Sequence, residues 1–399
     1  MTKTRIYFDN AASSFPKPEV VIEAMSEFLR TCGNPGRGAH HFALEGARKI
    51  FDARENIADF LGVNQSERLI FTGGCTASLN MVIKGLALDG RLKPGDAVIV
   101  SSMEHNAVMR PLAQLQDSLG IIIVICPVGE NFEQDLQVLV EQHQPKLVAL
   151  VWASNVTGDV LPIQSVAKFL KTKNIPLLVD GAQTAGKLNA NLSENSGITF
   201  FCASGHKGLM GPPGVGLLYV APGISLDPII SGGTGSRSES LEMPVAFPDR
   251  LESGTLPGPA IAGLSAGVDW LRKNDSDSLF QAEIALTEKF LQWSESRKFL
   301  KLYGPKSRTK AMSSGRMPVV SFSMVNVSAA TLADKLDTEY GIAVRSGLHC
   351  SAATHKALGT LKEGLVRVSI GPLNTVTEVD QLCTALEKMA ASGTNTRKL

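Results

Sequence analysis

The sequence predicts an α/β protein built on a mostly parallel sheet, followed by a smaller α/β unit. Runs of Val, Ile and Leu alternate with helical segments through the middle of the chain, which is typical of parallel strands covered by helices on both faces. The chain has 399 residues, a length that favours about two domains. Its composition, 44% hydrophobic and 19% charged residues, excludes disordered and fibrous classes.

Net charge and hydropathy narrow the classes of partner that we expect this protein to bind. The net charge of +1 gives no electrostatic reason to expect nucleic acid or an anionic membrane as a main partner. The strongest apolar run, residues 119–126, has the length of a strand and is too short to span a membrane. Because residues 1–6 lack the apolar core of a signal peptide, we expect a cytoplasmic protein.

The first elements alternate between strand and helix. Residues 5–8 read as a short strand, and Phe15-Pro-Lys-Pro18 opens a helix that reaches about Leu29, with proline where a missing N–H costs little. Residues 34–38 are broken by glycine and proline and form a candidate active-site loop. Residues 41–61 carry apolar side chains at helical spacing, which predicts a long amphipathic helix.

Strands and helices then alternate up to a predicted domain boundary. After a strand ending near Phe71, the expected strands are 97–102, 121–126, 147–153, 177–180, 198–203 and 215–220. We place a large domain at 16–258 and a small C-terminal domain at 259–399, joined by the segment 1–15. In the small domain we expect strands near 319–324, 342–345 and 366–370, and helices near 329–340 and 376–391.

Three stretches point to one cofactor. Lys207, in Ser204-Gly205-His206-Lys207-Gly208, follows a predicted strand and is flanked by small residues, where an amine can become a nucleophile. Asp180 ends another strand, at the sheet edge where parallel sheets meet their ligands. Gly73-Gly74 lead into a helix, which is typical of a phosphate cradle. An amine, an acid and a phosphate site together suit pyridoxal 5′-phosphate.

Motifs in the same order resemble a known family. They are Ile6–Ala12, Asn34–His40, Phe71–Asn80, Glu104-His105-Asn106, Ser154–Gly158, Asp180–Gln183, Ser204–Lys207, Glu252–Thr255 and Arg345–Cys350. On these motifs the chain resembles the cysteine desulfurases, in the class V aminotransferase group of fold type I pyridoxal-phosphate enzymes. The resemblance implies a large domain with a mostly parallel seven-stranded sheet, a smaller C-terminal α/β domain and a homodimer.

The resemblance also implies roles around the cofactor. Lys207 would bind its aldehyde and later move the substrate's Cα proton, and Asp180 would hold the ring nitrogen protonated. His105 would stack on the ring, as a catalytic and cofactor-binding residue, and Gln183 would face the ring hydroxyl. Asn155 would face the ring oxygen or the substrate. The phosphate would be bound by Gly74, Cys75, Thr76, Ser204 and His206, with Thr234 completing the site of a partner subunit.

On the substrate side, the resemblance implies two arginines and a cysteine. Arg367 is expected to clamp the substrate carboxylate, and Arg345 to face the substrate or support the site, because the guanidinium fork matches a carboxylate. Cys350 would take sulfur from L-cysteine as a persulfide, leaving L-alanine and passing sulfur to an acceptor protein. A neighbouring histidine and a nearby arginine could favour its thiolate.

Alternatives remain open from the sequence. The same scaffold serves selenocysteine lyases and other class V lyases or aminotransferases, and a non-catalytic binding protein could keep the fold. Six scattered cysteines with no Cys-x-x-Cys pair argue against a disulfide framework and a structural zinc site: Cys32, Cys75, Cys126, Cys202, Cys350 and Cys383. For Cys350 with His349 and His355 we favour no metal site, because Cys-x4-His matches no usual ligand spacing.

Overall fold

The computed structural model describes residues 5–36, 38–305 and 315–394, and contains two compact units. The larger unit comprises Pro16–Trp152 and Pro162–Ser276. The smaller unit comprises Met1–Phe15, Ala153–Leu161 and Asp277–Leu399. Within the described residues, no helix combines the length and apolar character that crossing a membrane requires.

This division differs in two places from the domain boundary predicted from the sequence, which lies between residues 258 and 259. Helix α7 (Gly258–Lys273) belongs to the larger unit, where it packs on α1 and α2. Its Gly258 lies so close to Phe28 that an added Cβ would meet the ring at 2.2 Å. Residues 153–161 belong to the smaller unit, where Ser321 Oγ donates to the Val156 carbonyl at 2.6 Å.

The larger unit is built on a seven-stranded sheet, which confirms the predicted fold class. The strand order is β2-β8-β7-β6-β5-β3-β4, and only β8 runs opposite to the other six. The strands are β2 (Leu69–Thr72), β3 (Ala97–Ser101), β4 (Ile122–Cys126), β5 (Leu147–Val151), β6 (Leu177–Asp180), β7 (Phe200–Ser204) and β8 (Gly216–Val220). Most of them are buried along their whole length, which explains their continuous apolar composition.

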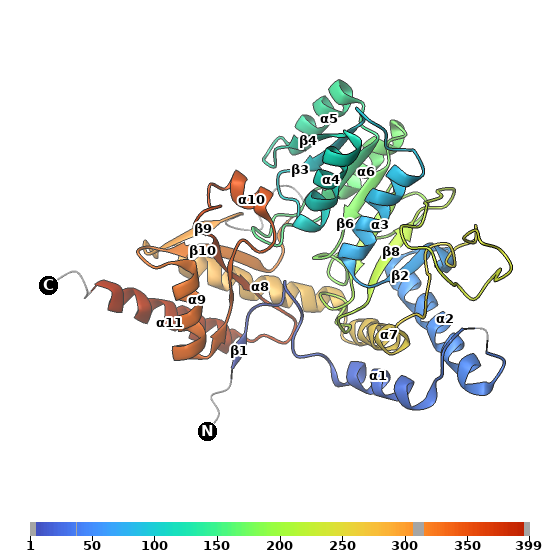
Figure 1. Cartoon of the computed structure of the whole chain (residues 1–399). Helices are drawn as coiled ribbons and strands as arrows, with labels where there is room; N and C mark the ends of the chain where they lie inside the picture. The colour runs from blue at the N-terminus through green and yellow to red at the C-terminus, as the bar shows by residue number, and fades with distance from the viewer. Residues whose placement is uncertain (1–4, 37, 306–314, 395–399) are drawn as a thin grey trace. The chain divides into compact units, whose positions relative to one another are not determined.

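Helices cover this sheet in two groups. Figure 1 shows α1, α2 and α7 lying together, while α3 and α4 lie side by side along the sheet and bury apolar residues against it. The helices of this unit are α1 (Glu19–Thr31), α2 (His41–Leu61), η1 (Ser66–Arg68), α3 (Cys75–Leu88), α4 (Asn106–Leu119), α5 (Phe132–His143), α6 (Ile163–Thr172) and α7. The bounds of α2 match the predicted helix, which ends at Gly62 in a left-handed conformation (φ 74°).

The smaller unit has a four-stranded antiparallel sheet, β12-β13-β10-β9, and a parallel pair, β1 with β11. The predicted strand 342–345 is therefore divided, because its two ends join different sheets. The elements are β1 (Ile6–Tyr7), α8 (Ser276–Ser294), β9 (Leu300–Tyr303), β10 (Val319–Met324), α9 (Ala329–Tyr340), β11 (Ile342–Ala343), β12 (Arg345–Gly347), α10 (Ala352–Ala357), β13 (Leu365–Ser369) and α11 (Val376–Thr394).

Candidate active site

Four chain segments meet at one edge of the large sheet. β2, β3, β6 and β7 point in the same direction, so the residues after their carboxyl ends lie along the same edge. These residues include Gly74 after β2, His105 after β3 and Lys207 after β7, while Asp180 is the last residue of β6. Such an edge is where open α/β sheets bind ligands.

Lys207 lies in a tight turn in which two positions have no room for a side chain. The Gly205 N–H donates to the Val215 carbonyl at 3.0 Å, and the Lys207 carbonyl accepts from the Met210 N–H at 2.9 Å. A Cβ at Gly205 would lie 2.8 Å from the Val215 oxygen, and one at Gly208 would lie 2.3 Å from the Ala185 oxygen. The glycines on both sides of Lys207 are therefore required by close backbone packing.

Asp180 is a buried carboxylate, only 3% exposed, and accepts two hydrogen bonds. Its Oδ1 accepts from the Ala182 N–H at 2.9 Å and from the Cys75 thiol at 3.4 Å. The next residue, Gly181, packs against Phe201, whose ring an added Cβ would meet at 2.2 Å. Gln183 follows in the same turn and is 7% exposed. Packing and hydrogen bonds thus fix the orientation of the carboxylate.

The start of α3 can accept an anion. Gly74 caps this helix of 14 residues in a conformation (φ 141°) that favours glycine, and a Cβ at Gly73 or Gly74 would meet no atom within 4 Å. Thr76 is exposed in the first turn, where helix N–H groups lack intrahelical acceptors. Behind them, Gly216 of β8 lies so close that a Cβ there would be 2.5 Å from the Gly74 backbone. Phosphate is the type of ligand that such a helix start binds.

Three further predicted residues of the larger unit have defined surroundings. His105 caps α4, and its Nδ1 accepts from the Ala107 N–H at 3.0 Å. Ser204 is 5% exposed at the end of β7. Burial, followed by the charges of Lys207 and Lys17, lowers the pKa of His206 to about 4, so its ring is neutral near neutral pH.

Two titratable neighbours of these residues were not expected from the sequence. Lys17 donates from Nζ to the His206 carbonyl at 2.8 Å, and burial lowers its pKa to about 8. Glu104 is fully buried, where its carboxylate accepts from the Val151 N–H and from Ser101 Oγ, and burial raises its pKa to about 8. Lys17 lies in the motif Phe15-Pro-Lys-Pro18, and Glu104 lies in Glu104-His105-Asn106. Neither motif shows which groups these two side chains contact.

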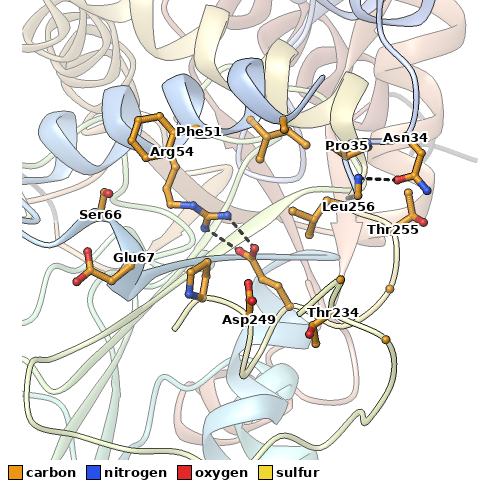
Figure 2. Close-up of a pocket in the computed structure, with 18 residues that line it drawn as sticks. Asn34, Pro35, Phe51, Arg54, Ser66, Glu67, Thr234, Asp249, Thr255 and Leu256 are labelled. Carbon is orange, nitrogen blue, oxygen red and sulfur yellow. Dashed lines mark hydrogen bonds and ion pairs between the residues drawn. The ribbon is translucent and has the colours of Figure 1, made fainter. Parts of the chain in front are cut away.

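Thr234 lines a cavity of about 600 Å³ within the larger unit. Figure 2 shows it on the glycine-rich segment, with Asp249 nearby and the loop of Asn34 and Pro35 on another side. The wall includes a buried ion pair, in which the guanidinium of Arg54 binds both carboxylate oxygens of Glu252 at 2.7 Å. The cavity therefore joins residues 34–36 of the candidate active-site loop to the segment that carries Thr234.

The smaller unit holds the predicted substrate residues. Arg367 is 2% exposed, and donates from Nη2 to Asp9 Oδ1 at 2.5 Å and from Nη1 to the Asn155 carbonyl at 3.1 Å. Arg345 lies opposite Arg367 in the antiparallel pair of β12 and β13, and its Nη1 lies 3.5 Å from Asp9 Oδ2. Asp9 thus holds both arginines together, a role that the sequence did not predict.

Cys350 is exposed on a turn with unusual backbone. Both His349 (φ 51°) and Cys350 (φ 55°) are left-handed, a conformation that costs energy for residues other than glycine. Asn155 holds this turn, because its Nδ2 donates to the His349 carbonyl and its Oδ1 accepts from Ser351 Oγ, each at 2.8 Å. Both ends of the Asn155 amide are therefore engaged within the smaller unit.

The charge state of His349 corrects one expectation. Burial, with a further contribution from the Arg367 charge, lowers the pKa of His349 to about 3. The ring is therefore neutral near neutral pH and brings no positive charge to the turn of Cys350. None of the six cysteines forms a disulfide. Across residues 5–36, 38–305 and 315–394, no cluster of three or more His, Cys, Asp or Glu side chains is arranged to hold a metal ion.

Comparison with known proteins identifies the family. The model of the aminotransferase class-V family matches residues 6–382. A probable cysteine desulfurase of Pyrococcus abyssi is 31% identical over 98% of this chain and 96% of its own length. A cysteine desulfurase of Yersinia pestis is 30% identical over 96% of this chain and 93% of its own length.

Comparison with solved structures points to the same family as the sequence comparison. The apo structure of a cysteine desulfurase from Thermococcus onnurineus aligns with a TM-score of 0.88 and 29% identity, over 97% of this chain and 95% of that one. A cysteine desulfurase from Escherichia coli aligns with a TM-score of 0.83 and 29% identity, over the same shares of the two chains. The chain therefore belongs to the class V aminotransferases and, among them, to the cysteine desulfurase family.

Proposed function

We propose that this chain is a pyridoxal 5′-phosphate-dependent cysteine desulfurase that converts L-cysteine to L-alanine and holds the sulfur as a persulfide on Cys350. The observation that carries the proposal is the meeting of Lys207, Asp180 and the start of α3 at one sheet edge, in a chain of this family. This set supplies an amine for the aldehyde, an acid for the ring nitrogen and N–H groups for the phosphate.

The residues of the larger unit fit the cofactor. Lys207 holds it covalently through its amine, and Asp180 pairs with the ring nitrogen. The first turn of α3, with Gly74, Cys75 and Thr76, binds the phosphate together with Ser204 and His206. A neutral His206 serves this role as a hydrogen-bonding group. When bound, pyridoxal phosphate supplies an electron sink for charge that develops on the substrate carbon.

Two further residues orient the ring. We assign His105 to its face and Gln183 to its hydroxyl group. The N-cap contact of His105 supports this assignment, because an Nδ1 that accepts from Ala107 leaves the proton on Nε2. A ring held in one tautomer and one orientation can contact the cofactor without rearranging.

On the substrate side, we assign Arg367 to the carboxylate. Its guanidinium is held by Asp9 and Asn155, and its Nε has no hydrogen-bond partner among the described residues. The oxygens of a substrate carboxylate accept hydrogen bonds from guanidinium N–H groups. Arg345, which is more exposed, lies beside it and adds positive charge. Asn155 then acts by holding the Cys350 turn and by orienting Arg367 through its carbonyl.

Cys350 accepts the sulfur. Its thiolate attacks the sulfur of L-cysteine, so an S–S bond forms while the substrate's C–S bond breaks and its electron pair stays on carbon. That carbon takes up a proton, and Lys207 moves the proton at Cα. The balanced result is L-cysteine plus a thiol giving L-alanine plus a persulfide. The exposed, left-handed position of Cys350 supports transfer to an acceptor, which we propose to be another protein.

We also propose that the protein is a cytoplasmic homodimer in which Thr234 completes the phosphate site of the second subunit. Apolar side chains exposed on the same segment support a protein contact there: Ile230 (62%), Leu241 (106%) and Val245 (73%). Sedimentation velocity tests the dimer, and a monomer at micromolar concentration would contradict it.

The activity is tested with Cys350→Ser and a matched control, Cys32→Ser. Cys32 is also accessible, but it lies at the end of α1, outside the proposed site. We expect Cys350→Ser to retain the cofactor's absorption and to lose alanine and sulfide production from L-cysteine, while Cys32→Ser keeps both. Sulfide production by Cys350→Ser at the wild-type rate would refute the assignment of the nucleophile.

A further inference from the structure

The Cys75 thiol is hydrogen-bonded to Asp180. The two residues are 105 positions apart, and Cys75 Sγ lies 3.4 Å from Asp180 Oδ1. Cys75 is the first residue of α3 and is 6% exposed. Burial, helped by the charge of Asp180, raises the pKa of the thiol well above its usual value. The sulfur therefore keeps its proton, and it can only donate to the carboxylate.

The carboxylate oxygens of Asp180 have different surroundings. The Ala182 N–H and the Cys75 thiol, the two donors recorded for this side chain, both bind Oδ1. Among the described residues, Oδ2 receives no hydrogen bond. One oxygen is thus held by the protein and the other is left for a ligand.

We propose that Cys75 is a positioning residue for the cofactor: its S–H donates to Asp180 Oδ1, which fixes the rotation of the carboxylate and leaves Oδ2 to pair with the cofactor ring nitrogen. This inference rests on the proposed function, because it gives Asp180 its cofactor role. The backbone of Cys75 was assigned to the phosphate, and its side chain acquires a separate role at Asp180.

Cys75 could instead be a small apolar residue of the core, and Cys202 provides the comparison. Cys202 is fully buried, lies on β7 directly beside Asp180 in the parallel register, and feels the same carboxylate charge. The Cys202 thiol donates no hydrogen bond to Asp180 among the described residues. Replacing each cysteine by alanine removes one buried thiol beside the same carboxylate, but only Cys75→Ala removes a donor.

The first test measures how tightly the holoenzyme binds pyridoxal phosphate. In Cys75→Ala we expect cofactor binding to weaken about ten-fold, which corresponds to the loss of one hydrogen bond to a charged group. Cys75→Ser restores a donor and should return the affinity toward wild type, while Cys202→Ala should leave the affinity unchanged. An affinity that is the same in Cys75→Ala and wild type would overturn the inference.

The second test needs no cofactor. The S–H stretching band of Cys75 is identified by Raman difference spectroscopy between cofactor-free wild type and Cys75→Ser. We expect this band to move to higher frequency in Asp180→Asn, because a neutral amide oxygen is a weaker acceptor. An unmoved band would overturn the hydrogen bond even if the protein binds pyridoxal phosphate, whereas a moved band without cofactor binding would refute only the proposed function.

Discussion

The buried ion pair between Arg54 and Glu252 allows a sharp prediction for Arg54→Met. The side chains are 7% and 5% exposed and share two contacts of 2.7 Å. Glu252 Oε1 also accepts from the Phe71 N–H at 2.6 Å, so the pair supports β2 just before the glycine turn. Methionine keeps most of the apolar stem and removes the charge.

The expected loss follows from the burial of both groups. Removing one partner of such a pair leaves an uncompensated buried charge, which costs about 3–5 kcal/mol of unfolding free energy. The matched control is Arg272→Met, which breaks an ion pair with Asp59 at 2.7 Å in which the side chains are 39% and 76% exposed. An exposed pair of this type contributes less than about 1 kcal/mol.

Urea unfolding of both variants, followed by tryptophan fluorescence, measures the two losses. The cost in Arg54→Met should also shrink at lower pH. Burial already raises the pKa of Glu252 and Arg54 opposes that rise, so without Arg54 the carboxyl group takes up a proton more readily. Equal losses in the two variants, or a loss in Arg54→Met that does not depend on pH, would refute this reasoning.

Two more predictions concern Glu104 and Gly216. Because burial raises the pKa of Glu104 from 4.5 to about 8, the folded state binds the extra proton and stability falls as pH rises through this window, by at most about 1.4 kcal/mol per pH unit. In Glu104→Gln we expect this contribution to the pH dependence of the unfolding free energy to disappear, as measured by urea unfolding across this pH window. A pH dependence identical to that of wild type would contradict the raised pKa of Glu104. In Gly216→Ala the new Cβ would lie 2.5 Å from the Gly74 backbone, so the start of α3 must shift and pyridoxal phosphate should bind about ten-fold more weakly, which corresponds to the loss of one hydrogen bond to a charged group. Gly129→Ala is the control, since a Cβ there meets no atom within 4 Å, and equal affinities in the two variants would contradict the prediction.

Local patterns predicted the larger elements well. Helix α2 has the predicted bounds because its apolar spacing and Gly62 act within the segment itself. The strands of the large sheet agree to within a few residues, since buried strands need continuous apolar runs. Helix α8, strand β9 and helix α10 were not predicted. α10 is only 6 residues long and β9 is a strand of 4, too short for a clear period.

Contacts between distant residues could not be predicted. The sequence indicated Lys207, Asp180 and Arg367 through their motifs. It did not indicate their supports, because the hydrogen bonds that place Lys17 against His206, Cys75 against Asp180 and Asp9 against Arg367 join residues 189, 105 and 358 positions apart. The domain division differed for the same reason, since packing against α1 assigns α7 to the larger unit.

The most direct test of the account is the attachment site of the cofactor. Borohydride reduction of the protein loaded with pyridoxal phosphate, followed by peptide mass spectrometry, should find the pyridoxyl group on Lys207. Lys17 is the informative competitor, because it contacts His206 and its pKa is lowered to about 8. A label on Lys17, or no label on any lysine, would contradict the central claim.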